Sequence, residues 1–342
     1  MHPDYVDAVR TEMDQLAFDT SLPHCRRHDT HRPVLIAVVQ NEFDHLPNLL
    51  NHHRTRGIQA FVILDNGSSD DSLEYLRAQD DVEVISVERP FSWQAKQAWI
   101  MRVIESIGFH RWYLVVDADE RVVFPGDHRY SFADLTADME LEGKWRIRGM
   151  LVDMYGPGPL LQPPERPLER SQTFFDGDGY REETTHHLNS VKGGPRHRAL
   201  STDEIQLDPE LTKYPLFRLA PGELMANPHH HWPYEENFKS PCHLGILHYK
   251  FGPELQQKIE SAIASGNYWN QSIEYRAYQA ALKANPDLSL AYGGSRRYRR
   301  PKDLVKSGLL ADLDWKKWRK QRWQRKQDEL RATVKSWFQK PP

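Results

Sequence analysis

The stretch Val34-Leu-Ile-Ala-Val-Val39, followed directly by Gln40-Asn41-Glu42, decides the fold. An unbroken apolar run of this length, rich in β-branched residues, predicts a strand that is buried on both faces. Similar runs lie at residues 60–64, 82–87 and 112–116, and apolar residues with helical spacing lie between them, at 43–56, from Asp70 onward and at 93–107. Strands that alternate with helices form βαβ units. We therefore predict an α/β fold, a three-layer sandwich with a mostly parallel central sheet.

The pattern is weaker outside this region. A short helix is predicted over residues 5–18, strands at 145–152, around Leu200 and at 245–251, and helices at 253–265, 271–284 and 302–310. We expect four segments: an N-terminal extension (1–31), a main domain (32–252), a helical C-terminal extension (253–311) and a basic, Trp-rich helical tail (312–342).

The net charge of −3 hides an asymmetry. From Arg296 onward the chain has 16 Lys/Arg and 5 Asp/Glu, a net charge of +11, so the preceding residues carry −14. The chain thus has an acidic body and a basic tail, and the positive charge of the tail suggests a role of its own.

Several classes of protein are excluded or disfavoured by composition. No apolar window is long enough to span a membrane, and no basic segment followed by an apolar stretch indicates a secretory signal. Cys25 and Cys242 lie far apart, which favours a reducing compartment, and we expect a cytoplasmic protein. Glycine-rich phosphate loops and a nucleophile elbow are absent. The run His229-His230-His231 matches no zinc spacing, and we expect a surface loop there.

Polar residues follow the apolar runs at the points where the strands end. They include Gln40-Asn41-Glu42, the run from Asp65 to Asp70, and Asp117-Ala-Asp119-Glu120. Because ligands bind beyond the carboxyl ends of the strands in open α/β sheets, these side chains are candidates for one site. The alternative for Ser69 or Asp70 is an ordinary helix N-cap.

The pair Asp117 and Asp119 has the chemistry of a cation site. Two carboxylates on the turn that leaves a buried strand can both reach Mg²⁺ or Mn²⁺, with substrate phosphates completing the coordination. The alternative is a solvated acidic turn. The phosphatase-like hydrolases also place Asp-x-Asp after a strand, but they favour Thr or Val where Arg121 stands here.

In this order, Val38-Val-Gln-Asn-Glu42, Leu64-Asp-Asn-Gly-Ser-Ser-Asp70 and Val115-Val-Asp-Ala-Asp-Glu120 resemble the family-2-like glycosyltransferases with the GT-A (Rossmann-like) fold. The nearest likeness is to a bacterial branch, which the downstream stretches 153–155, 193–198 and 247–251 also resemble. The resemblance covers about residues 33–310. It implies transfer of a sugar from a nucleoside-diphosphate sugar, such as a UDP-sugar, to a hydroxyl acceptor, with inversion and with Mn²⁺ or Mg²⁺ as cofactor.

The resemblance also assigns residues to roles. The nucleotide-sugar would contact the polar strand ends and two basic residues: Asn41, Glu42, Asp65, Asn66, Asp117, Arg196 and Lys250. The metal would be held by Asp117, Asp119 and His248, although His248 is equally compatible with a histidine packed in the core. An inverting enzyme needs a carboxylate base. Asp153 is the first choice, followed by Glu182, Glu183 and Asp176.

The basic tail contains four tryptophans among many Lys and Arg. Such a helix either lies in an anionic membrane interface, which would give peripheral contact at the inner face, or packs on the acidic body. The acceptor would be a glycan or a lipid-linked molecule, and membrane contact of the tail would favour a lipid-linked or envelope-polysaccharide acceptor. No recognisable reading module indicates nucleic-acid binding.

Two other functions fit the same residues. A metal-dependent phosphohydrolase or nucleotidyltransferase would use the same carboxylates without a sugar acceptor. A non-catalytic protein that binds nucleotide-sugars or glycans would show affinity without turnover.

Overall fold

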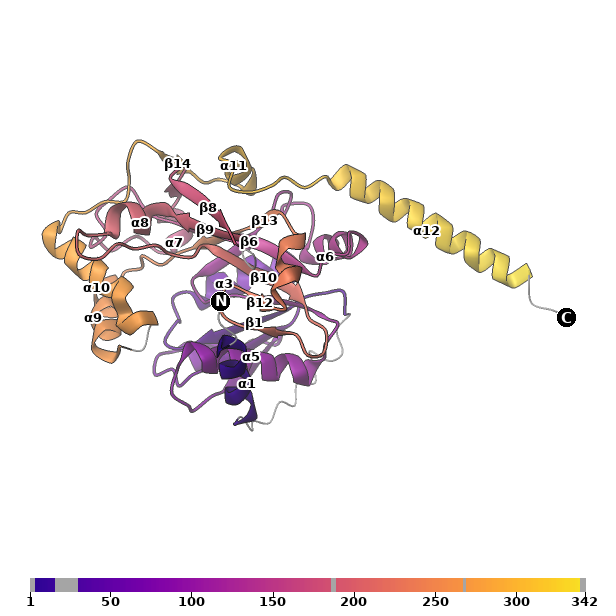
Figure 1. Cartoon of the computed structure of the whole chain (residues 1–342), viewed down its shortest axis with the longest axis horizontal. Coiled ribbons are helices and arrows are strands. Elements are labelled where there is room, and N and C mark those ends of the chain that lie inside the picture. Colours follow the sequence, from indigo (N-terminus) through magenta and orange to yellow (C-terminus); the bar gives the residue numbers. More distant parts are fainter. Residues whose placement is uncertain (1–3, 16–29, 186–188, 267–268, 339–342) are drawn as a thin grey trace.

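The computed structural model of the chain describes residues 4–15, 30–185, 189–266 and 269–338. Within these residues the centre is an eight-stranded sheet with the order β3-β2-β1-β4-β10-β6-β13-β5 (Figure 1). In that order the strands are Val82–Ser86, Phe61–Asp65, Val34–Val39, Trp112–Val115, Thr212–Arg218, Arg146–Asp153, Cys242–His248 and Glu120–Val123. The predicted α/β class with a mostly parallel central sheet is confirmed.

The first half of the sheet is parallel. Strand β1 pairs in parallel with β2 and with β4, and β2 pairs in parallel with β3. Alternate residues of β1 belong to different apolar clusters, Leu35 and Ala37 to one and Val34 and Ile36 to the other. Both faces of this strand are therefore covered, which explains its unbroken apolar sequence.

The second half of the sheet is mixed. Strand β10 is antiparallel to both β4 and β6, β13 is parallel to β6, and β5 is antiparallel to β13 at the edge. The strand predicted around Leu200 is wrong, because residues Gly194–Leu200 form helix α8, with Pro195 in its first turn. Proline suits the start of a helix, since its missing N–H has no partner to bond there.

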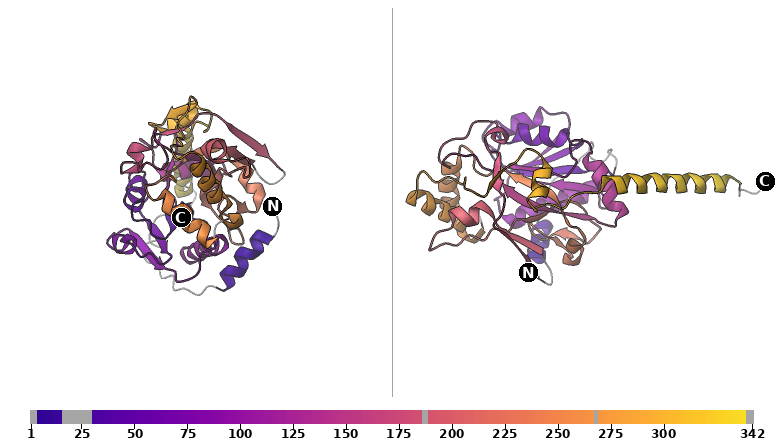
Figure 2. Two further views of the ribbon diagram at one scale, coloured as in Figure 1. Left: turned by 90° about the vertical axis from the view of Figure 1, so that its left-hand side faces the viewer. Right: turned by 90° about the horizontal axis from the view of Figure 1, so that it is seen from above.

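Helices cover both faces and give the predicted three layers (Figure 2). One face carries α3 (Leu46–Arg54), α4 (Ser72–Arg77) and α6 (Phe132–Leu141), which contribute to the same apolar cluster. The other face carries α5 (Trp93–Ile107) and α1 (Asp4–Asp14). The helix predicted over residues 5–18 is therefore present to Asp14, and its last residues lie outside the described ones.

The remaining elements form smaller units. Helices α9 (Leu255–Ser265) and α10 (Trp269–Ala284) share a separate apolar cluster with Leu200 of α8. The predicted C-terminal helices are thus present, including α11 (Pro301–Lys306). The other elements are α7 (Leu168–Ser171), η1 (Tyr234–Lys239) and the paired strands β7 (Phe174–Asp176) with β14 (Ser295–Arg297), β8 (Tyr180–Thr184) with β9 (Asn189–Gly193), and β11 (Leu224–Met225) with β12 (His231–Trp232).

The histidine run does not form the surface loop that the sequence predicts. His230 is 2% and His231 1% exposed, and the ring of His231 hydrogen-bonds to the carbonyl of Tyr214. His229 contacts the carbonyl of Thr212 in the same way. These rings pack beside strand β10 and help to bury it.

The tail forms the 24-residue helix α12 (Trp315–Phe338). Its start packs on the body: the Trp315 ring stacks on Tyr130 with centroids 3.9 Å apart, and its Nε1 donates to the carbonyl of Pro125. Trp318 Nε1 donates to Glu142. The rest of the helix projects away from the body (Figures 1 and 2). None of the described helices has the length and apolar character to cross a bilayer.

Burial of His53 on α3 predicts a stability that depends on pH. Burial lowers the pKa of this imidazole from 6.5 to about 3. The unfolded chain takes up a proton near the ordinary pKa and the folded chain does not, so the free energy of unfolding should fall as the pH drops from 6.5 toward 3. The loss from this residue at about pH 5 is roughly 2 kcal/mol. Urea denaturation of wild type and His53→Leu measures it: the variant should lose less stability on acidification, and equal losses would contradict the account.

Candidate functional site

The carboxyl ends of β1, β2, β4, β6 and β13 lie at one edge of the sheet, because these strands run in the same direction. The end of β13 carries His248, and the turn between β4 and β5 carries Asp119. A backbone bond from Tyr249 N to Asp119 O, 2.9 Å long, holds this turn against the end of β13. The edge therefore gathers polar side chains from segments far apart in sequence.

Asp119, His248 and Asp153 form a line of direct contacts. His248 Nε2 lies 3.3 Å from Asp119 Oδ2, and His248 Nδ1 lies 2.6 Å from Asp153 Oδ1. Although burial opposes it, the charges of Asp119 and Asp153 raise the pKa of His248 to about 9. A protonated His248 ring can thus donate to both carboxylates, one through each ring nitrogen.

Asp153 is buried behind His248. The side chain is 1% exposed, and its second oxygen accepts a 2.8 Å hydrogen bond from Arg196 Nε. Burial alone would raise the pKa of Asp153, but Arg196 and His248 lower it to about 2. Both carboxylate oxygens are therefore occupied. Asp153 thus holds the His248 ring through one oxygen and accepts from Arg196 through the other.

Arg196 and Lys250 share a second carboxylate. Arg196 Nη1 lies 3.1 Å and Lys250 Nζ 3.5 Å from Oε1 of Glu274 on α10. Lys250 also lies over the ring of Tyr275, 5.1 Å from its centroid. The remaining terminal nitrogen of Arg196, Nη2, is buried without a hydrogen-bond partner. Both basic residues are thus close to the Asp153–His248 pair. Glu274, which pairs with both of them, belongs to the same cluster of charged residues, and no sequence motif predicted it.

Asp117, which precedes Asp119 on the same turn, is ion-paired with two lysines. Lys213 Nζ lies 3.0 Å from Asp117 Oδ2, and Lys96 is ion-paired with the other oxygen. Lys213 is also ion-paired with Glu120, whose side chain is 1% exposed. The two ammonium groups hold the pKa of Asp117 well below its usual range, although partial burial opposes this shift. Sequence analysis missed both lysines, because each stands in an element with no polar motif.

Glu42 and His45 lie beside Asp119 at the start of α3. His45 Nε2 is 3.9 Å from Glu42 Oε2, and Lys258 Nζ is 3.7 Å from Glu42 Oε1. Burial raises the pKa of Glu42 to about 7; Lys258 opposes this shift, and the charges of Asp119 and Asp117 add to it. Glu42 therefore belongs to the same electrostatic group as the Asp-x-Asp turn.

The end of β2 offers an unused acceptor. Asp65 is 2% exposed, and its Oδ2 accepts from Ser68 N at 3.2 Å, whereas its Oδ1 is buried without a partner. The amide of Asn66, the next residue, donates to the carbonyls of Val87 and Arg89 and so fixes the end of β3. A ligand with an N–H or O–H group would satisfy Asp65 Oδ1.

Asn41 joins two loops at this edge. It adopts a left-handed backbone with φ of 56°, and its Oδ1 accepts from Ser69 N at 2.7 Å. Ser72 Oγ in turn accepts from Glu42 N at 3.0 Å. The loops after β1 and β2 are thereby held together, so Asn41 shapes the site through the backbone.

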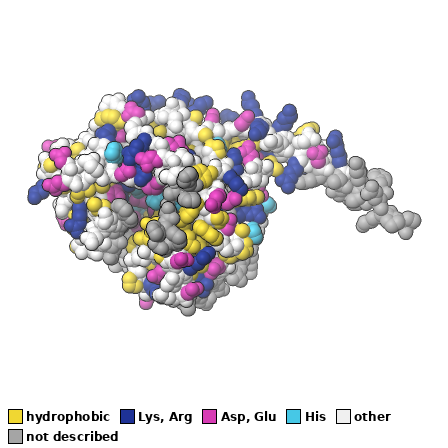
Figure 3. All heavy atoms as spheres, in the orientation of Figure 1, with side chains coloured by type: hydrophobic (Ala, Val, Ile, Leu, Met, Phe, Trp, Pro, Cys, Tyr) yellow, Lys and Arg dark blue, Asp and Glu magenta, His cyan; other side chains and the backbone are white. Residues whose placement is uncertain are grey.

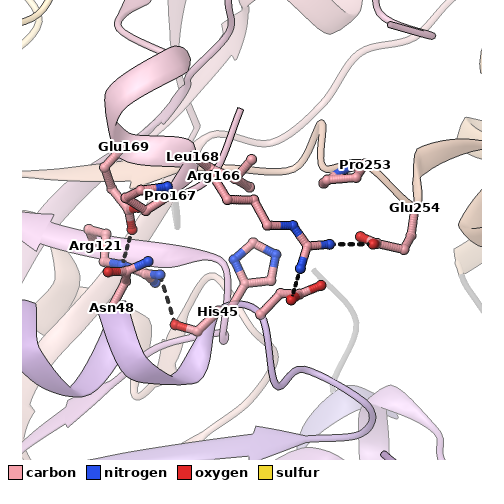
Figure 4. Close-up of a pocket in the computed structure, with 10 residues that line it drawn as sticks. His45, Asn48, Arg121, Arg166, Pro167, Leu168, Glu169, Pro253 and Glu254 are labelled. Carbon is pink, nitrogen blue, oxygen red and sulfur yellow. Dashed lines mark hydrogen bonds and ion pairs between the residues drawn. The ribbon is translucent and has the colours of Figure 1, made fainter. Parts of the chain in front are cut away.

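Arg121 directly follows the Asp-x-Asp turn and its Glu120. It is 1% exposed, and its guanidinium donates to the carbonyls of Ala118 and His45 and to Glu169 (Figure 4). It therefore braces the back of the Asp-x-Asp turn. A cavity of about 250 Å³ adjoins it, and Arg166, which is ion-paired with Glu254, also lines this cavity.

Glu183 is not brought into the group. It lies on the exposed hairpin strand β8, and its carboxylate pairs with Arg181 at 2.9 Å. None of the contacts recorded for the described residues links it to Asp119 or His248.

The residues at the edge fit a cation only in part. Over the described part of the chain, no group of three or more His, Cys, Asp or Glu side chains is arranged to hold a metal ion. Asp117 is directed to its lysines, but Asp119 Oδ2 and His248 Nε2 face each other. The hydrogen bond from His248 to Asp153 matches the carboxylate–histidine arrangement behind many metal ligands. One carboxylate and one imidazole suffice where substrate phosphates and water complete the shell.

Comparison with known proteins gives no family assignment. No family model matches the chain, and no curated protein matches it. Among solved structures, S. aureus TarS 1–349 is 17% identical over 41% of this chain and 43% of that chain, with a TM-score of 0.26. The 4-diphosphocytidyl-2C-methyl-D-erythritol synthase is 13% identical over 55% of this chain and 74% of that one, with a TM-score of 0.29.

A third solved structure is glucosyl-3-phosphoglycerate synthase from Mycobacterium tuberculosis, in complex with Mn²⁺, UDP and glucosyl-3-phosphoglycerate. It is 15% identical over 45% of this chain and 54% of that chain, with a TM-score of 0.24. The chain thus spans about half of the length of this synthase and of TarS. At these identities and TM-scores the likeness assigns no activity to the chain.

Proposed function

We propose that the chain is a glycosyltransferase that moves a sugar from a nucleoside-diphosphate sugar to a hydroxyl acceptor. The observation that carries the proposal is the line Asp119–His248–Asp153 at the carboxyl edge of the sheet, beside Glu42. It combines cation-binding donors with the ordered strand-end motifs that resemble family-2-like enzymes. The fold supplies the position, because ligands of open α/β sheets bind at this edge.

The nucleoside would lie against the end of β2. Asp65 Oδ1 is a buried acceptor without a partner, as expected where a ligand N–H or ribose hydroxyl completes the site. Asn41 and Asn66 hold the surrounding loops and so contribute by shaping this position. Uridine is the base that the family resemblance favours.

Asp119 and His248 would hold Mn²⁺ or Mg²⁺, and Asp153 would orient His248. Such a cation, when bound, supplies positive charge for the diphosphate that departs from the sugar. Lys96 and Lys213 place two further ammonium groups next to Asp117. Asp117 then acts as the fixed anion that positions these lysines toward the diphosphate, and is not itself a metal ligand.

Transfer with inversion requires one displacement. The bond from the acceptor oxygen to the anomeric carbon forms while the bond from that carbon to the diphosphate oxygen breaks, and a carboxylate takes the acceptor's proton. Asp153 is better placed to orient His248 than to be this base. Glu183 stays a prediction for the base, and it would have to approach with the acceptor.

Ligand-dependent stabilisation tests the donor site. A nucleoside diphosphate at about 100 times its Kd should raise the free energy of unfolding by about 2.7 kcal/mol, and Mn²⁺ should strengthen the effect. Asp65→Asn should lose this stabilisation, because it places an amide where the ligand needs an acceptor, while its own melting temperature changes little. Asp203→Asn, at an exposed loop position, is the matched control.

Three results would contradict the proposal. The first is the absence of a shift with every nucleoside diphosphate and sugar nucleotide in a panel. The second is hydrolysis of nucleotides to phosphate or pyrophosphate at a rate that no sugar acceptor changes, which indicates the hydrolase or nucleotidyltransferase alternative. The third is donor binding without sugar transfer to any acceptor in a panel, which indicates a binding protein.

A further inference from the structure

Helix α12 uses one face to attach to the body. The attaching residues Trp315, Trp318 and Arg322 are spaced three and four apart, so they lie on one side of the helix. Trp318 Nε1 lies 2.8 Å from Glu142, and Arg322 Nη1 lies 3.2 Å from Asp134 on α6. These contacts fix the direction in which the helix leaves the body. At 1.5 Å per residue, the 24 residues of α12 extend about 36 Å.

The side of the helix next to the attaching face presents a basic–apolar stripe of four residues: Arg319, Trp323, Lys326 and Leu330. Their spacing of four, three and four places them in one row along the helix. Trp323 is 61% and Leu330 54% exposed, whereas the other exposed large apolar side chains of the described residues, Phe43 and Leu161, are each 37% exposed. The most exposed apolar side chains are thus both on the projecting helix.

The charge around the stripe is strongly positive. Residues 315–331 contain eight Lys/Arg and two Asp/Glu, and Figure 3 shows dark blue side chains along the described part of the projecting helix. Lys316, Lys317, Lys320, Arg325 and Arg331 are exposed around the stripe. The surface that covers this helix must therefore accept apolar side chains and supply negative charge at the same time.

We propose that the basic–apolar stripe of α12 docks the protein on an anionic lipid bilayer. Trp323 and Leu330 would enter the interfacial region, where tryptophan is favoured, while Arg319 and Lys326 extend their charges to the lipid phosphates. The packed start of α12 would hold the sheet edge and its site at a fixed distance from the membrane. This docking does not depend on the proposed donor chemistry.

The stripe suits a second copy of the helix less well. In a parallel pair Arg319 and Lys326 would face their own copies along the seam. In either orientation the pair would bring together two helices that each carry eight Lys/Arg and two Asp/Glu over residues 315–331, and like charges at close range destabilise a contact. An anionic bilayer both accepts apolar side chains and supplies negative charge. We choose the bilayer over a second copy because basic and apolar residues alternate along the stripe, so its partner must accept both.

Vesicle flotation of the full chain tests the proposal. The protein should float with vesicles of phosphatidylcholine and phosphatidylglycerol, remain in solution with phosphatidylcholine alone, and be released by high salt. Arg319→Gln/Lys326→Gln should bind about 25-fold more weakly, about five-fold for each charge. Lys283→Gln/Lys302→Gln, with the same charge change on the body, should bind like wild type. Trp323→Gln should also weaken binding, and Leu161→Gln should not.

Three outcomes would overturn the proposal. The first is equal flotation of stripe and control variants, and the second is no flotation of the wild type. The third is a dimer in light scattering that Trp323→Gln converts to a monomer, because a second copy would then cover the stripe. All variants should keep the wild-type melting temperature and the donor-dependent shift, which separates this test from that of the proposed function.

Discussion

Replacing Asp119 by asparagine is expected to lower kcat/KM for sugar transfer by more than about 100-fold. Removing a partner behind a metal ligand typically costs about 10–100-fold in metal affinity or activity, so loss of the ligand charge itself should cost more. His248→Ala should have a similar effect. The double variant should be little worse than either single one, because the two groups act on one cation.

Steady-state kinetics with a donor and an acceptor at varied Mn²⁺ measures these effects. Asp203→Asn makes the same chemical change at an exposed position and should keep wild-type kinetics. Asp153→Asn should lose about 10–100-fold and be partly restored by more Mn²⁺, as expected for a residue that acts through His248. Asp119→Asn with wild-type kcat/KM and wild-type Mn²⁺ dependence would rule out the assigned role.

Removal of the Lys213 ammonium should produce the largest loss of stability among single substitutions at this edge. Lys213 is 10% exposed and is ion-paired with both Asp117 and Glu120. The change Lys213→Met leaves two close carboxylates without their shared cation, and breaking a buried pair costs about 3–5 kcal/mol. Urea denaturation should show a lower midpoint with an unchanged m-value.

Two further variants give this prediction its controls. Lys213→Met/Glu120→Gln should regain part of the loss, because the fully buried carboxylate is then neutral. Lys96→Met should cost less, because the Lys96 and Asp117 side chains are 15% and 35% exposed and water can solvate the remaining charge. A Lys213→Met protein within about 1 kcal/mol of wild type would show that the pair is not a structural requirement.

The parallel half of the sheet was predictable from sequence, because strands buried on both faces must be continuously apolar. The predicted boundaries of the first four strands agree with β1, β2, β3 and β4 to within one residue at each end. The mixed half was not predictable in this way. Strand β10 contains Lys213 and Pro215, with a register shift between Lys213 and Leu216, so its apolar pattern is interrupted.

Strand β5 was not predicted from the sequence, for a related reason. Its first residues, Glu120 and Arg121, are charged and yet 1% exposed, because each is neutralised by a partner from elsewhere. A single sequence shows the charges and gives no sign of the partners. The sequence therefore predicted a turn at these residues and no strand, whereas the chain continues directly from the Asp-x-Asp turn into a buried strand.

The candidate site was likewise predictable in part. Strand-end motifs predicted Asp119, Glu42 and Asp65 at one edge, because parallel strands end together. The partners that define the roles of these residues come from distant segments with no motif: Lys96 on α5, Lys213 on β10 and Glu274 on α10. Only the folded chain shows that Asp117 is directed to lysines and that Asp153 lies behind His248.

Anomalous X-ray diffraction from crystals grown with Mn²⁺ and a nucleoside diphosphate tests the central claim most directly. The account predicts a Mn²⁺ peak in coordination distance of Asp119 Oδ2 and His248 Nε2, with diphosphate oxygens on the same ion and Lys213 still paired with Asp117. A nucleotide bound at this edge without the ion, or an ion held by other residues while His248 remains bonded to Asp119, would contradict it.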